Sequence, residues 1–372
     1  MRRPKGHIRQ RGKNSWQIKH DLPSEGGQRR TRFETFHGTK ADAEKRLREL
    51  LHMADKGTLP EPDQQTVAEY LTAWLDSTCE QSPKTLERYR ELADLKIIPH
   101  LGNIKLQKLK PEHIPAWHRK LLDEGTNPPS IGHAHRVLTK VLGVATKNGT
   151  VTRNVAAVHA PPRVERRKIE ILSPDQVAAV KRKLKGHPLF PIVYLALATG
   201  MRRGELLALQ WGDVDLERGT LRVERAVEET KTGLRLKPPK TEQGRRTITL
   251  PAEAVGVLRD HKVPQMELRL KIGMGPIKDD TLLFSTTDGH LVRPRNITKA
   301  WHRVRQAMRL PNVSFHSFRH THASHLLRLG IDVQTVSSRL GHRDATITLK
   351  IYSHLTEGAD AAAAKAIEGL LS

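Results

Sequence analysis

The sequence predicts a multidomain α+β protein: a three-stranded sheet with one helix, a four-helix domain, and a mainly α-helical domain with a small antiparallel sheet. Strand-like runs are confined to the first 36 residues and to residues 220–250. Apolar residues at helical spacing fill most of the remaining chain. Two segments rich in proline and in polar or charged residues, 57–65 and 161–168, read as linkers. We therefore expect domains at residues 1–60, 64–160 and 168–372.

The composition points to a nucleic acid as partner and argues against a membrane. Lys and Arg number 64 against 40 Asp and Glu, a net charge of +24, which favours binding to a polyanion. No apolar run has the length of a membrane span, and the N-terminus lacks the apolar core of a secretory signal. The single cysteine, Cys79, suits a reducing cytoplasm. The charge does not distinguish a repressor from an enzyme.

The first domain reads as a small basic module. Three strand-like runs are followed by a helix that starts at Thr39, and they cover His7–Gln10, Trp16–His20 and Arg29–Phe36. The first 32 residues hold ten Lys or Arg against two acidic residues, a net charge of +8. A three-stranded sheet with a basic open face can enter a major groove of DNA. The alternative is a basic hairpin that only faces solvent.

The second domain reads as four helices. Each start is marked by a capping residue or a proline, at Thr66, Ser82, Pro111 and Ser130. The second helix is expected to end before Pro99. These signals alone would fit any helical bundle.

The third domain opens on a capping box formed by Ser173 and Gln176, and an apolar helix follows at Pro191–Thr199. Gly200 is expected to end that helix, and Arg202 stands where another begins. Helix N-termini attract anions, and an arginine there adds a forked donor. Glu205, three residues further, could hold Arg202 in place.

Strand-like runs in the third domain predict the small sheet. They cover Thr220–Glu224, Leu234–Lys237 and Arg246–Leu250, and Lys240 falls in the turn between the last two. Lys240 could be a functional cation or an ordinary solvated turn residue. Lys231 and Lys237 in the same region compete with it for a functional role.

Two further helices are expected between residues 312 and 355. Ala323, Leu326 and Leu327 share one helical face, and Gly330 suits the end of that helix. A second apolar stripe stops at Gly341. This stretch also carries the densest set of reactive side chains in the chain: His316, Arg319, His320, His342 and Tyr352.

The chemistry of this set favours a phosphodiester as target. A phenol has a pKa of about 10 and needs cations and a base to act as a nucleophile near neutral pH. A guanidinium fork matches two phosphate oxygens. Tyr352 could instead be an ordinary half-buried aromatic residue. The closely spaced histidines could also bind a metal, although no cysteine and no HExxH pair accompanies them; they are His316, His320, His322 and His325.

Four separated motifs, in this order, resemble the tyrosine recombinase (phage integrase) family. They are TGMRRGE with Arg202, PKTEQGRRTITL with Lys240, FHSFRHTHASHLL with His316 and Arg319, and LGH with His342, ten residues before Tyr352. The likeness extends over essentially the whole chain. GHIRQRGKNSWQI and the helix after it resemble the arm-type DNA-binding domain of phage integrases. Residues 64–160 resemble the SAM-like core-binding domain.

The resemblance implies a site-specific DNA recombinase that cuts and rejoins DNA through a 3′-phosphotyrosyl link. Tyr352 would attack the phosphodiester and release a 5′-hydroxyl. Arg202 and Arg319 would bind the non-bridging oxygens. Lys240, on a mobile β-hairpin, would protonate the leaving oxygen.

The histidines and one acid complete the implied site. His316 would be the acid/base partner of the phenol, and His342 would hydrogen-bond the phosphate. Glu205 would support the site by orienting an arginine. The bond energy is kept in the protein–DNA link, so the resemblance implies no cofactor and no metal.

The resemblance also implies partners and a setting. The substrate would be double-stranded DNA attachment sites, bound by a homotetramer that exchanges its C-terminal tails, Thr356–Ser372. A tail docked on its own domain is the alternative. Accessory DNA-bending or excision factors are possible partners. The location would be the bacterial cytoplasm, at the nucleoid when bound to DNA.

Three functions therefore stay open at this point. The first is an integrase that inserts or excises a phage or other mobile element. The second is a type IB-like topoisomerase, which has the same covalent chemistry but needs no partner site. The third is a DNA-binding regulator that keeps the fold without the chemistry. The complete set of six motif residues argues against the regulator.

Overall fold

The structure is a computed structural model of the chain. It describes residues 5–21, 31–55, 64–78, 81–164, 170–239, 241–342, 344–346, 349 and 367–368. The chain divides into two compact units, Met1–Glu165 and Arg166–Ser372, which are described separately below. The expected division into three domains is finer than this one and stays a prediction.

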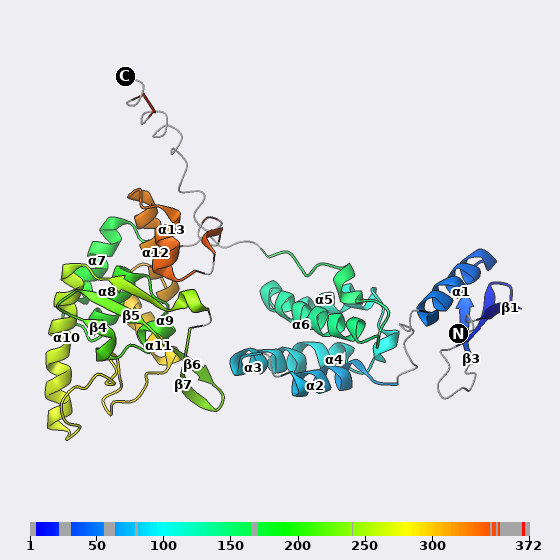
Figure 1. The fold of residues 1–372 in the computed structure, drawn as a ribbon, viewed down its shortest axis with the longest axis horizontal. Helices are drawn as coiled ribbons and strands as arrows, with labels where there is room; N and C mark the ends of the chain where they lie inside the picture. The colour runs from blue at the N-terminus through cyan, green and yellow to red at the C-terminus, as the bar shows by residue number, and fades with distance from the viewer. Residues whose placement is uncertain are drawn as a thin grey trace. The chain divides into compact units, whose positions relative to one another are not determined.

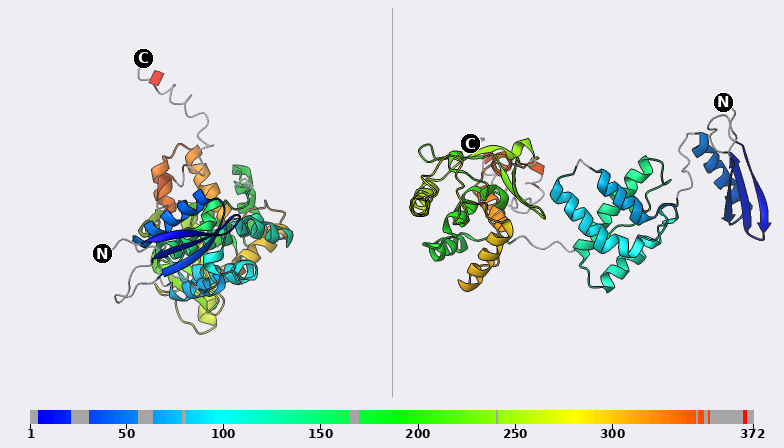
Figure 2. Two further views of the ribbon diagram at one scale, coloured as in Figure 1. Left: turned by 90° about the vertical axis from the view of Figure 1, so that its right-hand side faces the viewer. Right: turned by 90° about the horizontal axis from the view of Figure 1, so that it is seen from below.

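The N-terminal module is an antiparallel sheet with one helix against it. The strands β1 (Gly6–Gly12), β2 (Ser15–Asp21) and β3 (Thr31–His37) lie in the order β1-β2-β3. Helix α1 (Lys40–Asp55) packs on one face, against β2 (Figure 2). Ile18 is fully buried on β2, whereas the next residue, Lys19, lies over the exposed ring of Phe33 at 5.6 Å from its centroid. One face of the sheet is therefore covered by α1, and the other is open.

The rest of the first unit is helical. Its helices are α2 (Val67–Ser77), α3 (Pro83–Leu92), α4 (Ile98–Leu101), α5 (His113–Asp123) and α6 (Pro128–Lys147). Short 3-10 turns lie at Leu106–Lys108 and Val155–Val158. The largest fully buried side chains of this core include Leu71, Ile97, Ile114, Leu121 and Leu138. The predicted helical domain is present.

Two predicted helix boundaries in this unit are wrong. The chain does not stop before Pro99, because a π-helical turn at Ala93–Ile97 connects α3 to α4. The N–H of Ile98 reaches back to the carbonyl of Ala93, and this wider turn leaves Pro99 in the first turn of α4, where its missing N–H is not needed. The cap of α6 is Asn127, whose side chain accepts from the N–H of Ser130.

The second unit is built around α8 (Phe190–Thr199), which has apolar residues on all sides. Figure 1 shows α7, α10 and α12 around it, and each of them contacts α8. The other helices of this unit are α7 (Pro174–Leu184), α9 (Arg203–Leu206), α10 (Ala252–Lys271), α11 (Pro294–Ala307), α12 (Phe315–Arg328) and α13 (Val333–Leu340). The expected capping box of Ser173 and Gln176 at the start of α7 is confirmed.

Two small antiparallel sheets lie in this unit. One has the order β4-β5-β8, from β4 (Val214–Asp215), β5 (Thr220–Val223) and β8 (Arg246–Thr249). The other is a hairpin of β6 (Ala226–Thr230) and β7 (Gly233–Lys237). The sequence did not predict β6, which pairs with β7 while β8 pairs with β5. The strands on either side of Lys240 therefore belong to different sheets, and the expectation of a turn between paired strands is wrong.

None of the described helices has the length and apolar character needed to cross a membrane.

Candidate active site

The candidate site forms where the C-terminal ends of α8 and α13 meet. Both helices end on a glycine in the left-handed conformation, Gly200 and Gly341, each with φ 65°. A Cβ atom on Gly200 would lie 2.7 Å from Cδ2 of Leu340 and 2.8 Å from Cδ2 of His322. Only glycine allows this approach, so the free carbonyls of both helix ends come close together.

Arg319 on α12 joins these two ends. Its side chain donates from Nη1 to the carbonyl of Gly200 at 2.9 Å and from Nη2 to the carbonyl of Leu340 at 2.8 Å. The residue is only 3% exposed. This guanidinium is therefore part of the packing as well as a source of positive charge at the site.

Arg202 stands at the N-terminal cap of α9, two residues after the turn at Gly200. Its side chain is 45% exposed. It donates from Nη1 to Oε1 of Glu205 at 2.8 Å and from Nη2 to the carbonyl of Gly341 at 3.4 Å. The backbone N–H of Arg202 also donates to Oε2 of Glu205, at 3.0 Å. The expected pairing of Arg202 with Glu205 is thus present.

Glu205 is 2% exposed and lies between two arginines. Its Oε2 atom also accepts from Nη2 of Arg246, at 2.9 Å. Burial alone would raise the pKa of the Glu205 carboxyl, but the guanidiniums of Arg246 and Arg202 bring this pKa below its usual value. The carboxyl is ionised at neutral pH and fixes both arginines. The sequence did not single out Arg246, because nothing along the chain links β8 to α9.

Three imidazoles surround the arginines. Burial, and then the charges of Arg319 and Arg202, lower the pKa of His342 to about 4 and also lower the pKa of His316. His320 packs edge-on against His316, with ring centroids 4.5 Å apart. Burial, His316 and Arg319 lower the pKa of His320 to about 4. The three rings are neutral at pH 7, so each can donate one hydrogen bond and accept another.

His320 is a site residue that the sequence analysis did not single out. It had been grouped with the possible metal ligands. A signal was available, since i and i+4 positions share a helical face, and His316 is four residues before it on α12.

The alternative of a histidine metal site is not supported by the arrangement of these side chains. His322 pairs through Nδ1 with the carbonyl of Leu197 at 2.9 Å, and His325 pairs through Nε2 with the carbonyl of Leu172 at 2.8 Å. Both are directed away from the other two histidines of that set. Within the described parts of the chain, no three His, Cys, Asp or Glu side chains gather as metal ligands.

Two of the predicted site residues, Lys240 and Tyr352, lie outside the described residues. The described structure brings together the other five. They come from three separate segments of the sequence, around residues 202–205, 316–319 and 342.

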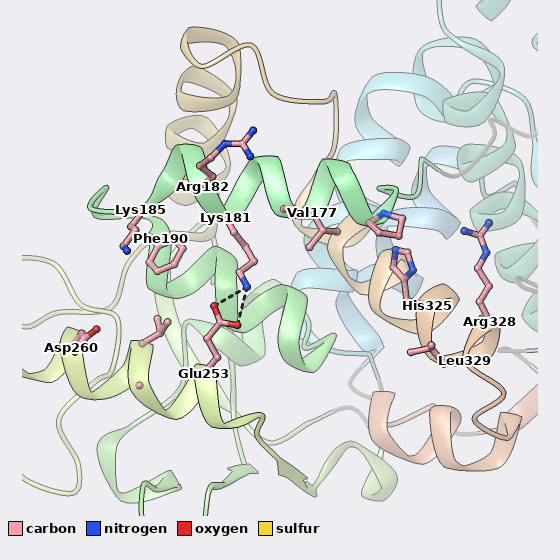
Figure 3. Close-up of a pocket in the computed structure, with 14 residues that line it drawn as sticks. Val177, Lys181, Arg182, Lys185, Phe190, Glu253, Asp260, His325, Arg328 and Leu329 are labelled. Atoms are coloured by element: carbon pink, nitrogen blue, oxygen red, sulfur yellow. Dashed lines mark hydrogen bonds and ion pairs between the residues drawn. The ribbon is translucent and has the colours of Figure 1, made fainter.

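A separate groove lies between α7, α10 and the end of α12 (Figure 3). Its apolar wall includes Val177, Phe190 and Leu329. Nζ of Lys181 lies 2.7 Å from Oε1 of Glu253 across it. None of the candidate site residues lines this groove.

The sequence matches two known families. Residues 174–358 match the phage integrase family. Residues 66–122 match the N-terminal SAM-like domain of phage integrases.

Curated relatives match most of the chain. A "tyrosine recombinase XerC-like" protein of Caldanaerobacter subterraneus subsp. tengcongensis is 28% identical over 344 residues, which cover 87% of this chain and 88% of the relative. A "putative prophage phiRv2 integrase" of Mycobacterium tuberculosis is 26% identical over 369 residues, covering 97% and 94%.

Solved structures share the fold. The Tn1549 transposon integrase bound to transposon right end DNA has a TM-score of 0.72 at 20% identity, covering 83% of this chain and all of that one. A lambda integrase dimer bound to a core site has a TM-score of 0.58 at 19% identity, covering 93% and 94%. These likenesses confirm the predicted α+β fold class.

Proposed function

The chain belongs to the phage integrase family of tyrosine recombinases, which are site-specific DNA recombinases, and from this premise we propose that it integrates or excises a phage or other mobile element with Tyr352 as nucleophile. The phenol oxygen attacks the scissile phosphorus, a 3′-phosphotyrosyl bond forms, and the 5′-oxygen leaves. A 5′-hydroxyl of a second strand then reverses the attack, which exchanges strands. The observation that carries this proposal is the meeting of two arginines and three neutral imidazoles where α8 and α13 end.

In the proposed mechanism, Arg202 and Arg319 bind the non-bridging oxygens of the scissile phosphate. The charge that develops on these oxygens in the transition state is stabilised by donors already held in place. Arg319 is fixed by two helix carbonyls and Arg202 by Glu205. Neither guanidinium has to reorganise much as the reaction proceeds.

We assign the leaving-group acid to Lys240. Of its competitors, Lys237 forms an ion pair with Glu228, a carboxylate that Arg235 also holds. That ion pair occupies the ammonium group of Lys237 within the hairpin. This engagement favours Lys240, which the family motif PKTEQGRR also indicates.

His316 is assigned as the base that takes the proton of the phenol, and His342 as a hydrogen-bond donor to the phosphate. Both roles suit neutral imidazoles: a base needs a free lone pair, and a neutral ring still has one N–H to donate. Glu205 is a supporting residue that keeps Arg202 in place.

Binding of double-stranded DNA follows from the net charge of +24 and from two exposed basic surfaces. One is the open face of the N-terminal sheet, with Arg9, Arg11 and Lys19. The other is one side of α11, with Arg295, Lys299 and Arg303 at helical spacing. Each suits contacts to phosphates along a groove.

We propose that the active assembly on attachment sites is a homotetramer with exchanged C-terminal tails, helped by DNA-bending or excision factors, in the bacterial cytoplasm. A lambda integrase structure that shares the fold is a tetramer on a Holliday junction. The tail beyond residue 350, apart from residues 367–368, lies outside the described residues.

A trapping assay tests the proposed chemistry. The full chain is incubated with nicked duplexes from the DNA flanking its gene, with EDTA present, and SDS-resistant protein–DNA adducts are measured. We expect an adduct with the unaltered protein and none with Tyr352→Phe. Binding without any adduct would favour the silent regulator, and cleavage that requires added metal would overturn the site assignment.

A second assay separates the recombinase from a topoisomerase. Relaxation of a supercoiled plasmid that carries no attachment site is measured at equal protein concentrations. A recombinase should leave this plasmid supercoiled, whereas a type IB-like enzyme would relax it.

A further inference from the structure

We propose that Arg246 is a positioning residue for DNA cleavage, which connects Glu205 and Arg202 to the end of α13 just before His342. The inference rests on the proposed function, because it concerns the same phosphate-binding site. Arg246 lies on β8, in a different segment from the assigned site residues. Its side chain is 6% exposed, so it acts through its neighbours and not through contact with the DNA.

All three nitrogens of the Arg246 guanidinium have an acceptor, and each acceptor belongs to a different segment. Nη2 donates to Oε2 of Glu205 at 2.9 Å. Nε donates to the carbonyl of Arg339 at 2.7 Å, in the last turn of α13. Nη1 donates to the carbonyl of Gly244 at 3.0 Å, in the turn before β8. A planar fork can hold these three directions at once, whereas the single ammonium of lysine cannot.

The connection between β8 and α13 is reciprocal. Arg339 reaches from α13 and donates to the carbonyl of Thr249 at 3.1 Å, just as Arg246 reaches from β8 to α13. Arg339 also donates to the carbonyl of Ala198 at 3.2 Å, near the end of α8. The two arginines thus fix the end of α13 against both β8 and α8.

Gly341 makes this contact possible. A Cβ atom there would lie 2.9 Å from Nη1 of Arg246 and 2.9 Å from the carbonyl oxygen of Gln243. The backbone that leads into His342 therefore passes directly over the Arg246 guanidinium. Its position depends on that side chain.

The functional consequence follows from Glu205. This buried carboxylate divides its two oxygens between Arg202 and Arg246. Without Arg246, one oxygen loses its partner, and the carboxylate is free to turn toward Arg202 or to take a proton. Arg202 and the backbone before His342 then shift together, so the phosphate donors no longer match the transition state.

The test compares Arg246→Lys with Arg225→Lys in the full chain. Arg225 is a matched control, since it also pairs with a buried carboxylate, Asp213 at 2.6 Å, but touches no site residue. Single-turnover cleavage of a nicked duplex from the flank of its gene is measured, and rates are divided by the folded fraction from circular dichroism. We expect cleavage by Arg246→Lys to fall about 100-fold, with unchanged DNA affinity and an unchanged control.

A second substrate separates phosphate positioning from leaving-group chemistry. In it, sulfur replaces the bridging 5′-oxygen, and a thiolate leaves without an acid. Arg246→Lys should stay defective on this substrate, because its defect lies in phosphate positioning. Recovery on the thiolate substrate would overturn the inference and assign the residue to the turn that follows Lys240.

A double-mutant comparison keeps the inference testable if Arg246→Lys is partly unfolded. Arg246 is proposed to act through Glu205, so Arg246→Lys combined with Glu205→Gln should cleave no more slowly than Glu205→Gln alone. Additive losses would overturn the inference, and so would a normal rate per folded molecule. If the unaltered protein forms no adduct, the proposed function fails; if it does and Arg246→Lys matches it, only the present inference fails.

Discussion

Arg202 and Arg319 carry the same charge but are supported differently. Arg319 is buried and pairs with two helix carbonyls, while Arg202 is half-exposed and pairs with Glu205. Burying a carbonyl without a partner costs about 1–3 kcal/mol. We predict that Arg319→Ala lowers the free energy of unfolding by about 3 kcal/mol, whereas Arg202→Ala changes it by less than about 1 kcal/mol. Urea denaturation measures both values.

Both alanine variants should lose the covalent adduct, since each removes a donor to the phosphate. Equal stabilities of the two variants would contradict the structural role given to Arg319. An adduct formed by Arg202→Ala at the normal rate would contradict its place in the site.

His322 makes the stability of the second unit depend on pH. Its Nε2 atom accepts from Nε of Arg339 at 3.1 Å, so that nitrogen cannot carry a proton. Burial and the charge of Arg339 lower the pKa of His322 from 6.5 to about 4. Between these values the unfolded chain binds a proton that the folded chain excludes, so stability is full above the unfolded pKa and is lost as the pH falls.

We therefore predict a lower free energy of unfolding at pH 5 than at pH 7, with His320 and His342 adding to the effect through their own lowered pKa values. His322→Gln cannot gain the proton and should show a shallower dependence. Urea denaturation at the two pH values tests this, and an equal or steeper dependence in the variant would refute the assignment.

Sequence patterns identified the site residues that act on the substrate, but not those that hold them. Arg202, His316, Arg319 and His342 stand in short motifs at helix ends, and the described structure brings them together. Arg246 stands in a motif too, within GRRTITL. Its role depends on where β8 meets α13, a long-range contact that no local spacing encodes.

At the scale of the elements, the site depends on helix ends that only glycine permits. A side chain at position 200 would meet both strain and overlap. The left-handed φ of 65° disfavours a Cβ atom, and that atom would lie 2.7 Å from Leu340. We predict that Gly200→Ala lowers the free energy of unfolding by about 3 kcal/mol, from strain and overpacking together.

Gly186→Ala is the matched control, since Gly186 has φ 80° but no atom within 4 Å of the added Cβ. It should cost about 1 kcal/mol from strain alone. Chemical denaturation of both variants measures the difference. Equal costs would mean that the meeting of α8 and α13 is looser than described.

Local signals predicted most elements because capping residues and apolar periods act locally. Ser173 and Gln176 cap α7 as expected, and Ala323, Val336 and Leu340 form the expected cluster between α12 and α13. The errors arose where tertiary structure decides. The π-helical turn that accommodates Pro99 and the pairing of β7 with β6 depend on contacts with the rest of the fold.

At the scale of the whole molecule, the charge is distributed over two compact units, 1–165 and 166–372. The predicted linker Arg163–Lys168 spans this boundary. We predict that limited trypsin cleavage of the full chain yields two resistant fragments divided in this segment, because folded cores protect their backbones from proteolysis. Mass spectrometry identifies the cut, and first cleavage within α6 or α8 would refute this division.

The open face of the N-terminal sheet is the clearest basic surface outside the active site. Arg9 and Lys19 lie on it, away from α1. We predict that Arg9→Ala with Lys19→Ala reduces the salt dependence of DNA binding by about 2, one per phosphate contact, and removes part of the nuclease footprint distant from the cleavage point. Cleavage of a short duplex should stay normal, since the second unit carries the candidate site. Lys45→Ala, on exposed α1, is the control, and an equal effect there would show that net charge, not this face, binds the DNA.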